Sequence, residues 1–299
     1  MSANPFIYFS GDSYMAGTEL ADDTLQCWKD MFGRYQAQPD ARYAEFLKAK
    51  TKETLDWSDS QYAQYMCCQR DRHWTSIVCD KHGIKHHNDG LGGSSQEAVL
   101  HRAIISFDKF ERDGNVPTLA IIQLTRPGRV TVYKDGVRRP SVKDLHNITP
   151  HTMFDFSILL DTDNTAAKTS TSYRLAHMDV ESNIGNIIRW LSTRAITNSF
   201  FKEKTGRYPI YVGGWVHKAG ADHIVFDPIS NNETISSSPG YQSLVTQSRV
   251  HTVNHNIWNL RQGYTDNLVC PGGHHTPQTH ANFAQFIAPH VLQELNDVS

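Results

Sequence analysis

Short apolar runs alternate along this chain with longer segments in which apolar residues recur every three or four positions. The runs are rich in β-branched and aromatic residues, which predicts strands, and they lie at 6–9, 76–79, 118–124, 209–213 and 223–226. The periodic segments predict amphipathic helices and include 96–112, 177–204 and 278–295. Strands that alternate with helices form parallel sheets covered on both faces. The pattern therefore predicts an α/β fold around a parallel sheet.

Two regions interrupt this alternation. Residues 20–75 are rich in aromatic side chains, with helices expected at 41–50 and 59–73, and residues 126–172 are polar and rich in turn formers. We interpret both as insertions in one domain that covers 1–299. Long irregular segments in compact domains are usually functional, so we expect the second to be a lid or to face the substrate. The aromatic residues of the first region predict core packing, an oligomer interface or a sugar-binding surface. These residues are Trp28, Trp57, Tyr62, Tyr65 and Trp74.

The composition is that of an ordinary globular protein and excludes several classes. Hydrophobic residues make up 39% and charged residues 20% of the 299 residues, and the net charge is −2, so we expect no nucleic-acid or membrane-surface partner. No apolar run is long enough to span a membrane. The N-terminus lacks the basic and apolar regions of a signal peptide, which favours a cytoplasmic location. The five cysteines form no CxxC pair, so neither a disulfide framework nor a zinc ribbon is expected.

A serine follows the first predicted strand. The sequence Gly11-Asp12-Ser13-Tyr14 comes directly after the apolar run 6–9. Ser13 is therefore expected at the carboxyl end of a strand, which is where open α/β sheets bind ligands. A turn residue beside a capping aspartate is the alternative structural interpretation of the same motif.

Two histidines precede the last predicted helix. Thr276 is a good N-cap and Pro277 suits the first helical position, so His274 and His275 lie just before the helix. The positive end of the helix disfavours an imidazolium ion and would help to keep a nearby base neutral at pH 7. Either histidine is a candidate general base.

A glycine pair lies before the predicted helix at 96–112. The sequence Ser94-Ser95-Gln96-Glu97 predicts a capping box from Ser94 to Glu97. Gly92 and Gly93 would then form a loop at a helix N-terminus, where backbone amides are oriented to bind an anion.

In order and context, these segments resemble the blocks of the SGNH (GDSL) hydrolase family. The resemblance covers the chain from end to end and implies a flavodoxin-like three-layer α/β/α sandwich with about five parallel strands. It implies that Ser13 is the nucleophile and that the amides of Ser13 and Gly93, or alternatively Gly92, bind the oxyanion. Counting back from His280 and Ala284 by the family's spacing selects His274 as the base, whereas counting from Pro277 leaves His275 open.

The chain departs from the family pattern at two points. The aspartate that usually precedes the histidine is replaced by Pro271 and Gly272, so a backbone carbonyl or a remote acid such as Asp266 would have to orient the ring. The Gly-x-Asn that usually follows the third strand is also absent. The missing oxyanion donor could be supplied by Thr125, Arg126 or Arg129. The guanidinium group of either arginine, and that of Arg129 in particular, could also bind an anionic group of the substrate.

The high histidine content raises a metal-site alternative. His251 and His255 have the spacing of a helical metal pair, but no glutamate follows the first histidine as it does in His-Glu-x-x-His zinc proteases. We therefore expect no metal and no other cofactor, and we expect His280, on the apolar stripe of the last helix, to be a packed residue.

The resemblance implies a serine esterase that forms an acyl-enzyme on an acyl ester, with an O-acetyl group on a carbohydrate as the favoured small-molecule substrate. The alternative is a catalytically decayed binding or structural protein on the same scaffold. Similar variants occur among phage-encoded SGNH-like proteins, which implies the host cytoplasm or the virion as a location. The sequence does not indicate an oligomeric state.

Overall fold

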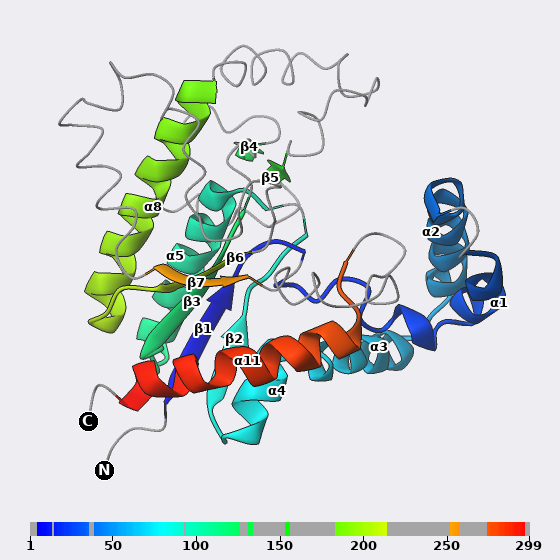
Figure 1. Ribbon diagram of the computed structural model, residues 1–299, viewed down its shortest axis with the longest axis horizontal. Helices are drawn as coiled ribbons and strands as arrows, with labels where there is room; N and C mark the ends of the chain where they lie inside the picture. Colours follow the sequence, from blue (N-terminus) through cyan, green and yellow to red (C-terminus); the bar gives the residue numbers. More distant parts are fainter. Residues whose placement is uncertain are drawn as a thin grey trace. The chain divides into compact units, whose positions relative to one another are not determined.

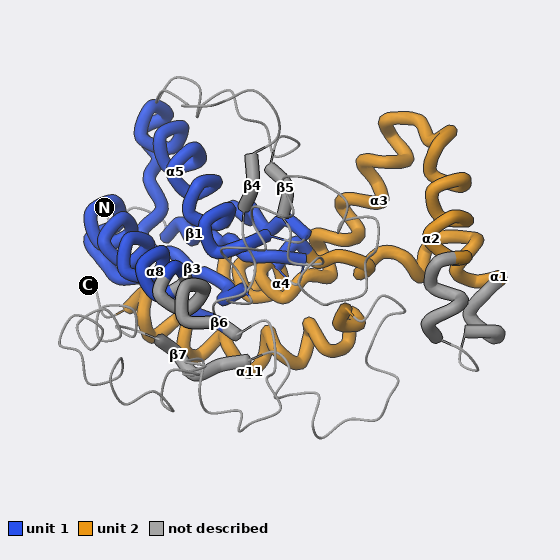
Figure 2. The backbone as a smooth tube through the Cα atoms, turned by 90° about the horizontal axis from the view of Figure 1, so that it is seen from above, with its two compact units in different colours: residues 1–16, 87–256 blue, residues 17–86, 257–299 orange. Residues whose placement is uncertain are grey.

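The computed structural model describes residues 5–13, 15–35, 39–92, 94–125, 131–133, 153–155, 183–213, 252–256 and 274–296. The chain divides into two compact units (Figure 2). Unit 1 comprises residues 1–16 and 87–256, and unit 2 comprises residues 17–86 and 257–299. The prediction of a single domain with two insertions is not tested by this division.

A five-stranded sheet organises the fold (Figure 1). Its strands follow the order β2-β1-β3-β6-β7, and they are β1 (Phe6–Ser10), β2 (Lys85–Asn88), β3 (Leu119–Leu124), β6 (Ile210–Gly213) and β7 (Thr252–Asn256). The pairs β1–β3, β3–β6 and β6–β7 are parallel. Two further strands, β4 (Thr131–Tyr133) and β5 (Met153–Asp155), form a separate antiparallel ladder. The strand order of the five-stranded sheet is that of a flavodoxin-like fold. The predicted α/β fold is therefore confirmed.

Unit 1 packs two helices on one face of the sheet. These are α5 (Gln96–Arg112) and α8 (Asn183–Thr205). Tyr8 of β1 meets Phe107 of α5 edge-on, with ring centroids 5.2 Å apart, and Phe201 of α8 at 5.9 Å. Side chains that alternate with Tyr8 along β1 point to the opposite face, and these residues, Ile7 and Phe9, are also fully buried. Burial on both faces explains why β1 reads as an unbroken apolar run.

The helices of unit 2 are α1 (Gln26–Tyr35), α2 (Pro39–Leu55), α3 (Asp59–Asp71), α4 (Trp74–Lys81) and α11 (Pro277–Asn296), with a 3-10 turn, η1, at Asp22–Thr24. Helix α11 packs on α4 through Trp74 and Phe283, whose ring centroids are 5.1 Å apart at right angles. Trp28 of α1 packs edge-on against Phe46 of α2. Trp28 and Trp74 are therefore packing residues, which is one of the interpretations that the sequence allowed.

The strand predicted at 76–79 is wrong, because these residues belong to α4. The side chain of His73 caps this helix by accepting a hydrogen bond from the amide of Thr75, and the preference of Ile77 and Val78 for strands yields to packing in unit 2. The predicted strand at 223–226 and most of 126–172 lie outside the described residues.

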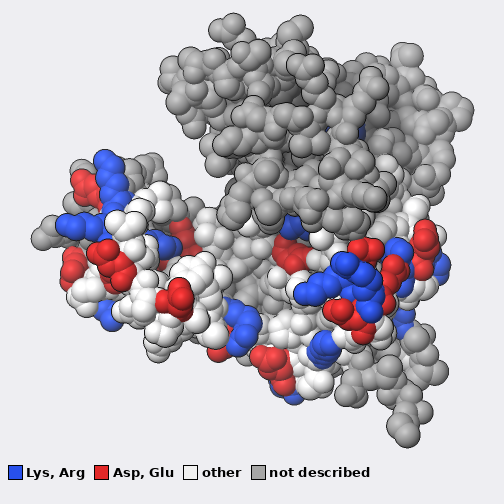
Figure 3. Space-filling model, turned by 180° about the vertical axis from the view of Figure 1, so that it is seen from behind, with Lys and Arg blue, Asp and Glu red and all other residues white. Residues whose placement is uncertain are grey.

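None of the described helices combines the length and the apolar character needed to cross a membrane. On the face drawn in Figure 3, the described basic and acidic side chains are interspersed.

Candidate active site

Ser13 lies at the topological switch point of the sheet. It follows β1, whose neighbours β2 and β3 lie on opposite sides, and the crevice beyond the carboxyl ends of such strands is the usual ligand site of open α/β sheets. The amide of Ala16 donates to the carbonyl of Asp12 at 2.9 Å, so the segment makes one helical turn. Ser13 is 8% exposed, and it is held in a defined turn.

The loop that carries Ser13 is fastened to β3. Gln123 Nε2 donates a hydrogen bond of 2.6 Å to Asp12 Oδ1, and both side chains are buried. A Cβ at Gly11 would lie 2.5 Å from Gln123 Cβ, so only glycine permits this approach. Asp12 therefore has a structural role beside the serine.

The loop after β2 packs against the Ser13 turn from the other side. A Cβ at Gly90 would lie 2.4 Å from the backbone nitrogen of Ala16 and from the carbonyl carbon of Met15. The carbonyl of Gly11 accepts hydrogen bonds from the amide of Leu91 at 3.1 Å and from the guanidinium of Arg102 at 3.0 Å. Backbone contacts thus fix the two loops together.

Asp89 anchors this second loop in unit 1. Its amide donates to the carbonyl of Phe9, and its carboxylate accepts hydrogen bonds from His87 at 2.6 Å, from Tyr8 at 3.0 Å and from Ser106. Burial alone would raise the pKa of Asp89, but the hydrogen bonds, led by that from His87, outweigh it and lower the pKa. The loop is therefore held by an ionised carboxylate.

The glycine pair proposed for the oxyanion hole is only partly described. Gly93 lies outside the described residues, and Gly92 is exposed. The N-cap of α5 is Ser95, whose hydroxyl accepts from the amide of Ala98 at 3.1 Å, so the predicted capping box from Ser94 to Glu97 is wrong. Ser94 instead donates to the carbonyl of Leu91 at 2.7 Å. Helix α5 begins at Gln96, three positions after Gly93 in the sequence.

The residues expected to replace the missing asparagine follow β3. Thr125 is buried, and its amide lies 3.4 Å from Gln96 Oε1 at the start of α5. Because Ser13 follows β1 and Thr125 follows the adjacent strand β3, both belong to the same edge of the sheet. Arg126 and Arg129 lie outside the described residues.

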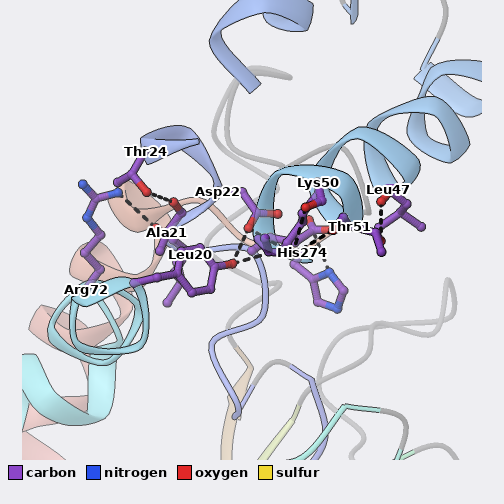
Figure 4. A network of polar contacts seen from close by, with 12 residues as sticks. Leu20, Ala21, Asp22, Thr24, Leu47, Lys50, Thr51, Arg72 and His274 are labelled. Atoms are coloured by element: carbon purple, nitrogen blue, oxygen red, sulfur yellow. Dashed lines mark hydrogen bonds and ion pairs between the residues drawn. The ribbon is translucent and has the colours of Figure 1, made fainter. Parts of the chain in front are cut away.

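In unit 2, His274 faces a buried carboxylate (Figure 4). Its Nδ1 lies 3.4 Å from Glu19 Oε2, and the side chain of Glu19 is 2% exposed whereas that of His274 is 18% exposed. A carboxylate beside Nδ1 favours the tautomer with the proton on that nitrogen, in which Nε2 is the basic atom. An imidazole placed in this way could act as a general base.

His275 and His280 lie deeper in the same unit. Both are essentially unexposed, and their ring centroids are 6.3 Å apart. The ring of His280 also packs against His73 at 4.7 Å, and its Nδ1 lies 3.4 Å from the amide of Trp74, which donates to it. Burial and the neighbouring imidazoles, His73 first among them, hold the pKa of His280 well below its ordinary value. His280 is a packed, neutral histidine.

Glu19 adopts an unusual backbone conformation. Within the described part of the chain it is the one non-glycine residue with a positive φ, at 73°. A left-handed conformation costs a residue with a Cβ about 1–2 kcal/mol. Strain of this kind persists where the surrounding structure enforces it, and it is concentrated at functional sites.

Close to Glu19, a second buried carboxylate holds a lysine and a tyrosine. Asp22 Oδ1 accepts hydrogen bonds from Lys50 Nζ at 2.6 Å and from the hydroxyl of Tyr65 at 2.5 Å (Figure 4). Lys50 also donates to the tyrosine hydroxyl at 3.1 Å. These contacts tie η1 to helices α2 and α3, and they steady the segment that follows Glu19.

Comparison with protein-family models and with curated proteins found no match for this chain. Among solved structures, the chain is similar to the crystal structure of the psychrotrophic esterase EstA from Pseudoalteromonas sp. inhibited by monoethylphosphonate. The match covers 98% of this chain and 100% of that chain, at 12% sequence identity and a TM-score of 0.41. At this low sequence identity and TM-score, the similarity carries no information about activity.

No group of three or more potential metal ligands is present among the described residues. The helical metal pair considered for His251 and His255 is wrong, because His255 lies in strand β7. His251 itself lies outside the described residues.

The two units carry different candidate catalytic groups. Unit 1 has a serine at the switch point of the sheet, in a turn that hydrogen bonds hold in place. Unit 2 presents an imidazole with a carboxylate at Nδ1. The carboxylate, Glu19, is the functional candidate that sequence reasoning missed. The remote acid suggested there, Asp266, lies outside the described residues.

Proposed function

We propose that this protein is a serine esterase in which Ser13 is the nucleophile, His274 the general base and Glu19 the acid that orients the base. The observation that carries the proposal is the contact between His274 and Glu19. It supplies a carboxylate where the sequence pattern lacks one. Ser13 and Glu19 are also only six positions apart on one segment, so the nucleophile and the acid are covalently linked by a short stretch of chain.

The proposed reaction has two half-reactions. Ser13 Oγ attacks the acyl carbonyl while His274 Nε2 takes its proton, and the imidazolium is stabilised by Glu19. The backbone amides of Ser13 and Gly93 bind the oxyanion. His274 then protonates the leaving alcohol, and an acyl-enzyme remains. Water attacks this ester with His274 again as the base, which releases the acid and restores Ser13.

His274 supports this role better than His275 does. His275 is fully buried among the histidines of unit 2, whereas His274 is partly exposed and has the carboxylate beside it. The proposed substrate is an acyl ester with a small acyl group, for which an acetyl group on a carbohydrate is the favoured case.

A fluorophosphonate probe tests the nucleophile directly, because it reacts only with an activated serine. We expect the wild type to be labelled at Ser13 and to hydrolyse p-nitrophenyl acetate, and Ser13→Ala to lose both. Removal of a nucleophile or a base typically lowers kcat by about 10⁴- to 10⁶-fold. The matched control is Ser10→Ala, which removes another buried hydroxyl from the same segment and should keep the labelling.

A second pair of variants separates the two histidines. His274→Ala should abolish labelling, whereas His275→Gln should retain it as long as the protein is folded. Treatment with EDTA should leave hydrolysis unchanged. A folded wild type that neither reacts with the probe nor hydrolyses the ester would overturn the proposal and favour a catalytically decayed binding protein.

A further inference from the structure

A cavity of about 400 Å³ lies inside unit 2, between η1 and the helices α2 and α3. Its volume is within the range of small-ligand sites, about 300–1,000 Å³. The lining combines two aromatic rings with neutral polar groups and one carboxylate, from residues Thr24, Leu25, Glu53, Trp57, Gln61, Gln64, Tyr65 and Cys68. The reaction proposed above uses none of these residues.

The aromatic wall of the cavity is rigid. The rings of Trp57 and Tyr65 pack against each other with centroids 5.4 Å apart and planes inclined at 58°. The Tyr65 hydroxyl is held by Asp22 and Lys50, so the ring cannot turn freely. Trp57 is half-buried, and its indole N–H makes no hydrogen bond within the part of the chain that the structure describes. An apolar face with an available donor at its edge is therefore presented to a ligand.

Two amides one turn apart on α3 form the polar wall. Gln61 Oε1 accepts hydrogen bonds from the amide and the hydroxyl of Ser58, both at 2.9 Å, which fixes its orientation and leaves its NH₂ group to donate. The side chain of Gln64 makes no hydrogen bond to any other described residue. A primary amide both donates and accepts, which matches the hydroxyl groups of a polyol.

The one carboxylate among the described lining residues is held by backbone amides and keeps its negative charge. Glu53 accepts hydrogen bonds from the amides of Gln26 and Cys27, at 2.9 and 2.8 Å, at the N-terminus of α1. Burial would raise the pKa of Glu53, but the hydrogen bonds from Cys27 and Gln26 outweigh it and lower the pKa. Neither lysine nor arginine is among the lining residues. The cavity is thus unsuited to a phosphate or another anion.

We infer that this cavity binds a neutral sugar ring. The C–H face of the ring would lie on Trp57, and its hydroxyls would bond to Gln61, Gln64 and the indole N–H. A planar nucleobase is a poorer fit, because the inclined rings of Trp57 and Tyr65 form no parallel walls, and a nucleotide would bring phosphates that no cation here neutralises. The inference does not rest on the proposed ester hydrolysis, since binding requires no chemistry at Ser13.

The test is a titration of the full-length Ser13→Ala protein, which removes any turnover of the ligand. The probes are cellotetraose, maltotetraose and the tetramer of N-acetylglucosamine, with adenosine as the competing class. Isothermal titration calorimetry measures the affinity, and tryptophan fluorescence reports on the indole. We expect saturable binding of at least one oligosaccharide and a weaker response, or none, to adenosine.

Variants at the cavity decide whether binding occurs there. In the Ser13→Ala background, Gln64→Ala and Trp57→Leu should each weaken binding by roughly tenfold or more, which corresponds to about 1.4 kcal/mol. Gln64 is exposed, so its replacement leaves the fold intact. Trp28→Phe is the matched control, because Trp28 packs against Phe46 and does not line the cavity, and it should bind as the parent does.

Three results would overturn the inference: no oligosaccharide binds at millimolar concentration, both cavity variants bind as tightly as the parent, or adenosine binds more tightly than every oligosaccharide. Each is independent of probe labelling at Ser13 in the wild type. A failure of sugar binding and a failure of the esterase proposal are therefore distinguished.

Discussion

His274 Nδ1 lies 3.4 Å from Oε2 of Glu19, a carboxylate that is almost fully buried. The two atoms are within the range of an ion pair. A carboxylate in this position would favour one tautomer of His274, without an aspartate in the preceding residues. It also makes Glu19 the residue through which the esterase proposal can be tested most sharply.

Glu19→Gln should lower kcat/KM for p-nitrophenyl acetate by about 10²- to 10⁴-fold while the protein remains folded. An amide in place of the carboxylate favours the wrong imidazole tautomer and no longer stabilises the imidazolium. The measurement is steady-state hydrolysis together with the rate of fluorophosphonate labelling. Asp23→Asn is the matched control, since Asp23 lies nearby but is half-exposed and pairs with Arg72. Equal losses in both variants would contradict a specific role for Glu19.

Glu19→Gly should be more stable than Glu19→Ala by about 1 kcal/mol, because only glycine adopts the left-handed conformation of this position without a Cβ penalty. Both variants lack the carboxylate and should be equally inactive. The free energies of unfolding in urea measure the difference. If alanine were tolerated as well as glycine, the backbone at position 19 would not be strained.

Gly90→Ala should destabilise the protein and slow the labelling of Ser13, because the new Cβ would overlap the backbone of Met15 and Ala16. Overpacking of this kind costs about 1–3 kcal/mol. Gly83→Ala is the control: it has a positive φ of 62° but open space around it, so it should cost about 1 kcal/mol without altering the rate of labelling. A Gly90→Ala protein that labelled as fast as the wild type would show that the turn tolerates displacement.

The stability of the wild type should fall as the pH decreases below about 6.5, the ordinary pKa of histidine. The pKa of His280 is lowered in the folded protein, so in this range the unfolded chain binds a proton that the folded chain does not. The cost is at most about 1.4 kcal/mol for each pH unit until the lowered pKa is reached. His280→Asn keeps an acceptor for the amide of Trp74 and should reduce this slope by about one proton, as measured by urea unfolding between pH 7 and pH 5.

Much of the fold follows from local patterns. Strands β1 and β3 are apolar except for Ser10 and Gln123, because both of their faces are buried. Helices α5 and α11 have clear apolar periodicity, with serine or threonine before their first turns. Strand β2 escaped prediction because its sequence, Lys-His-His-Asn, is polar, as is typical of the edge position that it occupies. Strand β7 was missed for a similar reason, because its sequence, Thr-Val-Asn-His-Asn, contains a single apolar residue.

Residues of the candidate site could be predicted from the sequence only where a predicted strand or helix lies next to them in the chain. Ser13 follows a recognisable strand, and His274 precedes a recognisable helix. The contact between Glu19 and His274 joins residues from opposite ends of the sequence, and no local periodicity signals such a pair. The same holds for the cavity beside Trp57 and Tyr65, where the sequence suggested a sugar-binding surface only as one interpretation of the aromatic residues.

Unit 2 consists of two segments that are far apart in the sequence, so one of them is synthesised well before the other. Trp74 receives its partners Phe283 and His280 from α11, and the hydrogen bond to His280 spans 206 positions. While the ribosome is still translating the intervening chain, α4 has no α11 to pack on, and Glu19 has no imidazole beside it. Such long-range contacts form slowly and leave apolar surface uncovered in the meantime. The nascent chain therefore carries Ser13 from the outset but receives the proposed base, His274, late, so the proposed esterase activity would appear only once α11 has emerged and packed on α4.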